Sequence, residues 1–106
     1  MPEPNLIAKL VEWYSEQCDG EWEHGSGIDI TTVDNPGWML KVNLRGTPLE
    51  SQQFEPIKVI KNEDDWINCR KKQTDFVGAG DPSKLAKILE HFLKFAGKLR
   101  RNEKQS

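Results

Sequence analysis

The residues best suited to chemistry lie in the first third of this sequence, around two carboxylates and a histidine. Glu21 and Glu23 fall two residues apart in a stretch, residues 21–24, that predicts a short strand around Trp22. Side chains at i and i+2 share one face of a strand about 7 Å apart, so this pair and the adjacent His24 could support acid–base hydrolysis. Neighbouring acids on a strand more commonly face solvent, and the sequence favours that interpretation.

A zinc site is the next chemistry to consider, since Cys18, Asp19, His24, Cys69 and His91 are all potential ligands. Their spacing matches no paired zinc motif, so no metal and no other cofactor is expected. Cys18 and His24 could also act as a nucleophile and its base. Because Cys18 falls on the apolar face of a predicted helix, a small buried thiol is the preferred interpretation.

A glycine pair precedes the last predicted helix, as in a phosphate-binding loop. Gly78-Ala79-Gly80 lacks the third glycine of such loops, and no lysine follows in the required register. Asp81 would also place a carboxylate on the amides that a phosphate needs. A flexible turn followed by a helix cap is therefore predicted here.

Four tryptophans are many for a chain of this length, and most should pack in the core. Trp38 and Trp66 lie in predicted strands and are expected in the core. Trp13 and Trp22 stand among acids. They are the better candidates for anchoring a partner, because tryptophan is frequent at interface hot spots.

Charge is unevenly distributed along the chain, although the net charge is only −2. Residues 1–34 carry eight carboxylates against Lys9 alone, residues 35–81 are balanced, and residues 82–106 are basic. An acidic surface can attract a basic partner and repel nucleic acid. A solvated face is the plainer interpretation of the same residues.

The length of 106 residues and the 36% of hydrophobic residues predict one small domain with one core. No apolar run approaches the roughly 18–20 residues that cross a bilayer, so no membrane association is expected. The acidic, proline-containing start does not resemble a secretory signal, and two cysteines do not make a disulfide framework. We therefore expect a cytoplasmic protein with reduced thiols.

The chain begins with a predicted amphipathic helix. Asn5 is a suitable N-cap, and Gly20 suits the left-handed position beyond the helix end. Its expected buried face follows the i, i+3, i+4 spacing of a helix and consists of Leu6, Ile7, Leu10, Val11, Tyr14 and Cys18.

Alternating and β-branched residues then predict antiparallel strands at 21–24, 28–33, 38–45, 54–61 and 66–72, the last of which residues 76–77 could extend. Pro56 indicates an edge position or a bulge. The segment from Asp34 to Gly37 predicts a type II turn with Pro36 in the second position and Gly37 at positive φ, in a loop wider than two residues.

Asp81, as N-cap, and Pro82, in the first turn, open the last predicted helix. Its apolar stripe is Leu85, Ile88, Leu89, Phe92, Ala96 and Leu99, and Gly97 interrupts that stripe. The whole order predicts an α+β fold of two layers. In it, an antiparallel sheet of four or five strands is flanked by an N-terminal and a C-terminal helix on the same side. Residues 1–106 form the single domain, with an ordered core at about 5–99.

Aromatic, glycine and acidic residues recur in a specific spacing in the first part of the chain: Trp13-Tyr14, Cys18-Asp19-Gly20, Trp22-Glu23-His24, Gly27-Ile28 and Asp34-Asn35-Pro36-Gly37-Trp38. Later pieces are Trp66 and Cys69, Phe76-x-Gly78-x-Gly80-Asp81, and Leu85, Leu89 and Phe92. This spacing resembles the immunity protein 53 family, small bacterial proteins predicted to neutralise the toxin domains of polymorphic toxin systems. The likeness covers about residues 6–95.

The resemblance implies a binding protein rather than an enzyme, one that covers or distorts the active site of a cognate toxin stoichiometrically. Nuclease toxins tend to be basic because they grip phosphates, so an acidic surface would mimic that ligand and accelerate encounter. The expected toxin-binding set is Glu12, Trp13, Glu16, Asp19, Glu21, Trp22, Glu23, His24, Asp29 and Asp34. Some of these residues can instead be structural, in the turns at 19–20 and 34–37, and a monomer and a homodimer both stay open.

Two alternatives belong to other classes of protein. A small hydrolase would use Glu21, Glu23 and His24 in a cleft. A nucleic-acid accessory protein would use the basic end of the chain, with Lys84, Lys87, Lys94, Lys98, Arg100 and Arg101. A pI near 5.7 argues against this alternative.

Overall fold

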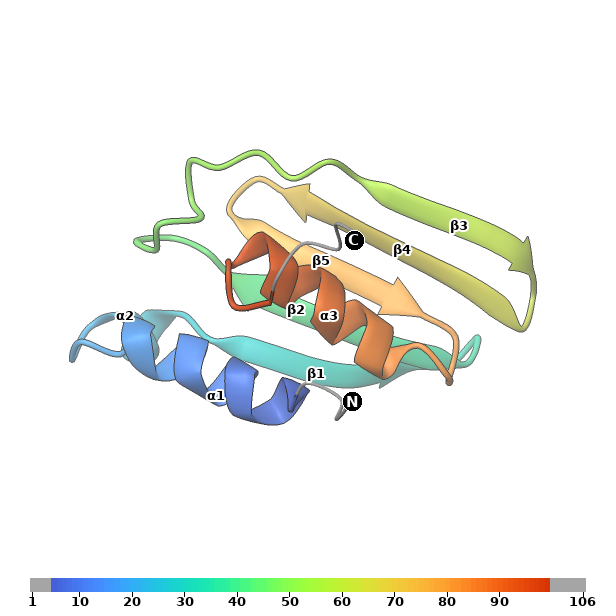
Figure 1. The fold of residues 1–106 in the computed structure, drawn as a ribbon, viewed down its shortest axis with the longest axis horizontal. Coiled ribbons are helices and arrows are strands. Elements are labelled where there is room, and N and C mark those ends of the chain that lie inside the picture. The colour runs from blue at the N-terminus through green and yellow to red at the C-terminus, as the bar shows by residue number, and fades with distance from the viewer. Residues whose placement is uncertain (1–4, 100–106) are drawn as a thin grey trace.

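A computed structural model describes residues 5–99 as one antiparallel sheet with helices on one face. The strands are β1 (Ile28–Val33), β2 (Gly37–Asn43), β3 (Ile57–Asn62), β4 (Asp65–Lys72) and β5 (Asp75–Gly80), in the sheet order β1-β2-β5-β4-β3. The helices are α1 (Leu6–Gln17), α2 (Trp22–Gly25) and α3 (Leu85–Phe95). Because α1 and α3 lie over the same face (Figure 1), the predicted two-layer α+β arrangement is confirmed, with five strands.

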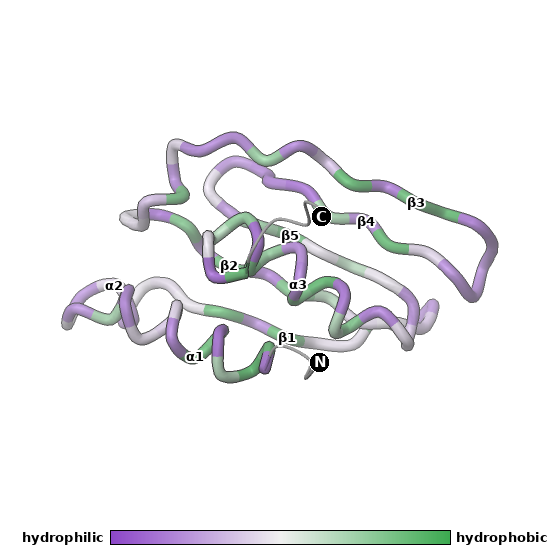
Figure 2. Tube along the Cα trace, in the orientation of Figure 1, coloured by the Kyte–Doolittle hydropathy of each residue, from purple (hydrophilic) through white to green (hydrophobic). Residues whose placement is uncertain are grey.

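The core lies between α3 and the central strands. Leu40 and Val42 of β2 are fully buried while Lys41 between them is exposed, so the predicted alternation of this strand is confirmed. Phe76 of β5 packs against Phe92 of α3 with ring centroids 5.2 Å apart. Figure 2 shows the same alternation of hydropathy along the strands and a hydrophilic turn between β3 and β4.

The buried face of α1 differs from the predicted one. Leu10 and Trp13 are buried, and Trp13 packs edge-on against Phe92 at 5.0 Å. Ile7, Val11 and Tyr14, predicted to be buried, are 59%, 56% and 38% exposed. The reason is that α1 packs mainly on α3 rather than flat on the sheet, which buries one side of its apolar surface and leaves the other side outward.

Residues 21–24 are not a strand, because side chains of the preceding turn stabilise the single helical turn α2. The Asp19 carboxylate accepts from the N–H groups of Glu21 and Trp22 at 2.9 and 3.0 Å. The Glu23 carboxylate reaches back to the N–H groups of Asp19 and Gly20 at 3.0 and 2.8 Å. Such local side-chain bonds compete with extended structure, and Gly20 takes the predicted left-handed conformation (φ +96°).

Residues 76–77 belong to a separate strand, β5, rather than extending β4, because a turn intervenes at residues 73–74. The pair Gly78 and Gly80 lies within β5, so the predicted flexible turn is wrong. A Cβ on Gly78 would stand 2.7 Å from Cγ2 of Ile88. These glycines allow α3 to approach the sheet closely, a known use of glycine inside strands.

The β1–β2 hairpin is closed by three residues, 34–36, so the loop is wider than two residues as predicted. The type II turn is wrong: Gly37 begins β2 without a positive φ, and the Asn35–Pro36 peptide bond is cis. A Cβ on Gly37 would collide with the carbonyl oxygen of Gly80. Close packing, rather than turn geometry, is what requires glycine there.

The last helix starts later than predicted. Lys84 is its N-cap, and Asp81 lies four residues before the helix. Gly97 does not interrupt the helix but ends it, with φ +77° and with the Lys98 N–H donating to the Leu93 carbonyl at 2.8 Å. This is the usual role of a glycine just beyond a helix.

The long connection from β2 to β3 is held down by Lys71 of β4. Its ammonium group donates to three backbone carbonyls, those of Leu49, Glu50 and Gln52, at 3.2, 2.6 and 2.5 Å. Phe54 from the same connection packs on Phe76 at 5.1 Å. β3 then runs at the edge of the sheet with an irregularity between Ile60 and Asn62, which confirms the prediction from Pro56.

The sheet face turned away from the helices is not covered by any described residue range (Figure 1). Cross-strand partners share a face, and the register places Met39, Lys41, Val77 and Arg70 on this side. It is therefore a mixed surface of half-buried apolar side chains and exposed cations.

Candidate functional site

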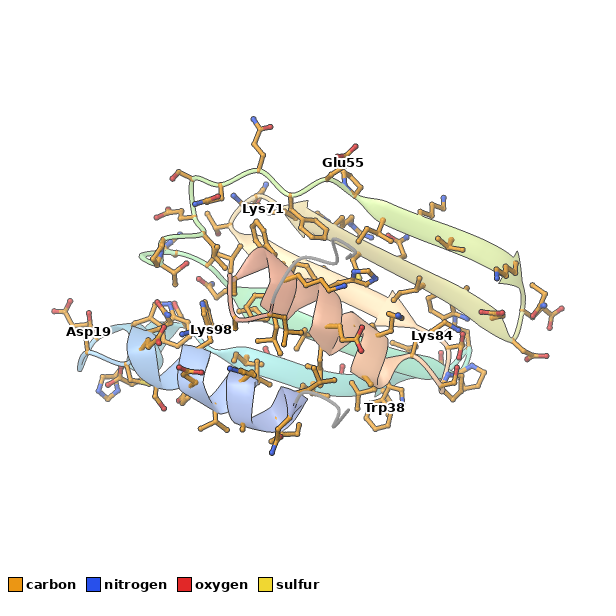
Figure 3. All side chains as sticks on the ribbon, viewed as in Figure 1. Asp19, Trp38, Glu55, Lys71, Lys84 and Lys98 are labelled. Atoms are coloured by element: carbon orange, nitrogen blue, oxygen red, sulfur yellow. The ribbon has the colours of Figure 1, made fainter. Side chains whose placement is uncertain are left out.

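The N-terminal acids do not form one cluster but follow one side of the molecule. Residues 5–33 build α1, α2 and β1, which lie together along the lower side of the view in Figure 1. Asp19 lies at one end of the molecule and Lys84 at the other (Figure 3). Asp34, in the β1–β2 turn, lies at the opposite end of β1 from the α2 corner, with the exposed Asp29 between them.

Two of the acids on α1 are paired with a lysine. Lys98 donates to Glu16 at 2.5 Å and lies 3.6 Å from Glu12. The hydrogen bond to Glu16 raises the pKa of Lys98. Both carboxylates stay about half exposed, at 52% and 50%, so they remain within reach of another molecule.

Asp19 and Glu23 stabilise the corner between α1 and α2. Hydrogen bonds from the Trp22 and Glu21 amides lower the pKa of the Asp19 carboxyl. Both oxygens of Glu23 accept backbone amides. These two residues of the predicted set therefore have a structural role, whatever they contact besides.

The arrangement required for the hydrolase alternative is not present in residues 5–99. Glu21 and Glu23 do not share a strand face, because they lie at the start of α2. Glu23 is engaged by two amides, and His24 is exposed on the outside of α2. The three side chains therefore do not converge in a cleft, as acid–base catalysis requires.

The expected placement of the tryptophans is reversed. Trp13 and Trp22 are buried, at 3% and 8% exposure, and pack against each other at 5.9 Å. Trp38 and Trp66 are only half buried at the opposite end of the sheet, where the indole N–H of Trp38 donates to the Pro82 carbonyl at 3.2 Å. Trp13 occupies the core because α1 turns that side toward α3, and Trp22 of α2 packs against it.

Three of the described lysines at the basic end of the chain are engaged with carboxylates. Lys84 caps α3 and donates to Asp65 and Asp81, both at 2.7 Å. Lys98 lies beyond the helix and pairs with α1. Lys87 lies 3.5 Å from Glu90, and Arg100 and Arg101 lie outside the described residues.

Among residues 5–99 the most buried charged group is Asp81, at 1% exposure, which the sequence predicts only as a helix cap. Its carboxylate accepts from Lys84, Ser83 and the Trp66 N–H at 2.6–2.8 Å. These bonds, led by that of Lys84, hold the pKa of Asp81 well below its usual range. Asp81 therefore joins β4, β5 and α3, and every contact is internal.

The two cysteines lie in different surroundings. The Cys18 thiol donates to the Tyr14 carbonyl at 3.3 Å, and burial raises the pKa of the Cys69 thiol to about 12. Both thiols are free. Within residues 5–99, there is no group of three or more histidine, cysteine, aspartate or glutamate side chains that could hold a metal ion.

A groove between α1 and β1 was not predicted from the sequence. It has a volume of about 610 Å³. It is lined by Leu10, Val11 and Tyr14 of α1, residues 25–27, Ile28 and Asp29 of β1, and Lys41 and Asn43 of β2. The signal was present in the sequence. The first helix has more apolar residues than one buried face can hold. Only the tertiary packing shows which of them stay exposed to solvent.

Within residues 5–99, the structure is a small antiparallel sheet with helices on one face and a groove beside its β1 edge. The family model for immunity protein 53 matches residues 7–97, so the chain belongs to that family. Members of this class protect against a toxin, which makes a toxin the implied partner. Comparisons with curated proteins and with solved structures gave no significant match.

None of the described helices has the length and apolar character needed to cross a membrane.

Proposed function

We propose that this chain binds a cognate toxin of a bacterial polymorphic toxin system and neutralises it by stoichiometric contact, in the cytoplasm and without chemistry of its own. The family membership supports this proposal most strongly. The toxin-facing side is the one built by residues 5–34, where α1, α2 and β1 lie together.

The charge of that side supports a basic partner. Residues 1–34 carry eight carboxylates against one lysine. Glu21, Asp29 and Asp34 are exposed, and no ion-pair partner for them is found within residues 5–99. Unpaired acids on one side steer a basic surface into encounter. A nuclease, which grips phosphate groups, is a toxin of that kind.

The test is binding to the toxin domain encoded beside this gene, in a catalytically inactivated form. Reversing Glu21, Asp29 and Asp34 to lysine should weaken binding by about tenfold or more, since each like-charge contact opposes association. Glu12 and Glu16 are left unchanged, because reversing them would also break the contact of Lys98 with α1.

A matched control is available on the other side of the molecule. Glu55, Glu63 and Asp64 are exposed and lie around β3, so reversing them changes the net charge equally. The control triple should bind like the parent. Equal affinity and equal salt dependence in both triples would show that the N-terminal acids do not face the toxin.

A further inference from the structure

The outer edge of β1 offers unpaired backbone groups. The Gly27 carbonyl accepts from the Asn43 N–H at 3.0 Å. In a regular antiparallel pair every second residue makes the backbone hydrogen bonds to the partner strand. Counting from Gly27, the residues that bond to β2 are therefore Asp29, Thr31 and Val33. The N–H and C=O groups of Ile28, Ile30 and Thr32 therefore point away from β2. Within residues 5–99, β1 pairs with β2 alone.

The two edges of the sheet differ in how they are protected from pairing. β3 follows Pro56, carries Lys58 and Lys61, and has a register irregularity. Such features commonly prevent one sheet from pairing with another chain. β1 has no proline, no lysine and a regular register over all its residues, so it is the edge that remains open.

The groove beside this edge is apolar on its helix side. Val11 and Tyr14 of α1 line it. Together with Ile7 of α1 and Ile30 of β1, which lie outside its lining, they make up four of the six large hydrophobic side chains exposed in the described residues. Ile30 lies opposite the buried Leu40, on the sheet face that carries the helices. An added strand would run along β1 beside α1 (Figure 1) and could place alternate side chains against these residues.

We propose that an extended segment of the toxin pairs with the outer edge of β1 as a sixth strand. Its apolar side chains contact Val11, Tyr14 and Ile30, and a basic side chain faces Asp29 on the other side of the sheet. This inference rests on the proposed function. A second copy of the chain is the poorer occupant, because it would bring two acidic segments, each of net charge −7 over residues 1–34, against each other.

Two pairs of variants test the edge. Thr32→Pro removes an outward N–H while leaving the bonds to β2, and Ile60→Pro does the same at the β3 edge. Ile30→Lys and Val59→Lys each place a charge on an exposed side chain, 40% and 46% exposed, of the helix-bearing face. The β1 variants should bind the inactivated toxin domain about tenfold or more weakly, and the β3 variants within about twofold of the parent.

Thermal unfolding of each variant shows whether it is folded. If Thr32→Pro is not folded, Ile30→Lys still tests the edge. In the parent, NMR-detected exchange of the Ile28, Ile30 and Thr32 amides should slow on adding the toxin. Unchanged exchange with the toxin bound, or equal losses at both edges, would overturn the inference and leave the proposed function standing. A parent that does not bind the toxin would overturn both. A free chain that is a dimer with these amides already protected would assign the edge to a second copy instead.

Discussion

At the scale of single residues, several carboxylates have a structural role. Asp81 is the clearest case. Its carboxylate is buried, bonded to Lys84, Ser83 and the Trp66 N–H, and so joins three elements. A buried carboxylate is stable only with such partners. Removing either the partners or the carboxylate destabilises the fold.

Replacing Asp81 with Asn should therefore lower the Tm by on the order of 10 °C at neutral pH. Because the folded protein lowers the pKa of Asp81, the stability it contributes is complete above the unfolded pKa of about 3.9 and is lost as pH falls below it. Thermal unfolding at pH 7 and at pH 3 measures this, and the difference between parent and variant should shrink in acid. A difference that grew in acid would contradict the assignment.

At the scale of elements, two glycines of β5 decide how closely α3 lies on the sheet. Gly78 faces Ile88, and Gly80 faces Lys84, each with room for a hydrogen but not for a methyl group. The sequence pattern of two glycines before a helix was interpreted as a turn, because glycine is common in turns. A strand with glycines on the helix-bearing face is the alternative that packing selects.

Gly78→Ala should destabilise the fold by about 1–3 kcal/mol, the usual effect of overpacking a core. The new Cβ would lie 2.7 Å from Ile88 and 3.2 Å from the Cys69 sulfur. Gly27→Ala is the control, since no atom lies within 4 Å of a Cβ there. Urea unfolding of the two variants compares them, and equal stabilities would show that α3 can shift without cost.

At the scale of the whole molecule, charge is arranged by side. The N-terminal third carries the excess of acids, and its elements lie together along one side of the sheet. The uncovered sheet face carries Lys41 and Arg70. Such a distribution orients an approaching partner more than it strengthens the final complex.

The association rate constant with a basic toxin domain should therefore fall several-fold as salt is raised from about 0.1 M to about 1 M, over which the Debye length contracts from about 10 to about 3 Å. The dissociation rate constant should change much less, because the contacts proposed at Val11, Tyr14 and Ile30 are apolar. Stopped-flow measurement at several salt concentrations separates the two. An association rate that salt does not change would argue against steering by these acids.

The sequence by itself determined the class of fold and most of its elements, although it did not predict the helical turn α2 or β5 as a separate strand. The alternation in residues 38–44 predicted β2 because its two faces meet different environments, and the apolar stripe of the last helix predicted α3. The spacing of residues 18–38 was enough to indicate the family. Each of these signals is local, or periodic within one element, and so can be detected without knowing the neighbours.

Only the tertiary structure decided which surfaces stay outside. Trp13 and Val11 are both large and apolar, yet one is buried at 3% exposure and the other is 56% exposed, because α1 packs on α3 from one side. Asp19 and Glu23 stabilise a turn because their carboxylates accept hydrogen bonds from backbone amides. The groove beside β1 forms because α1 packs on α3 rather than flat on the sheet. Which elements pack together depends on the whole chain, so no single segment predicts it.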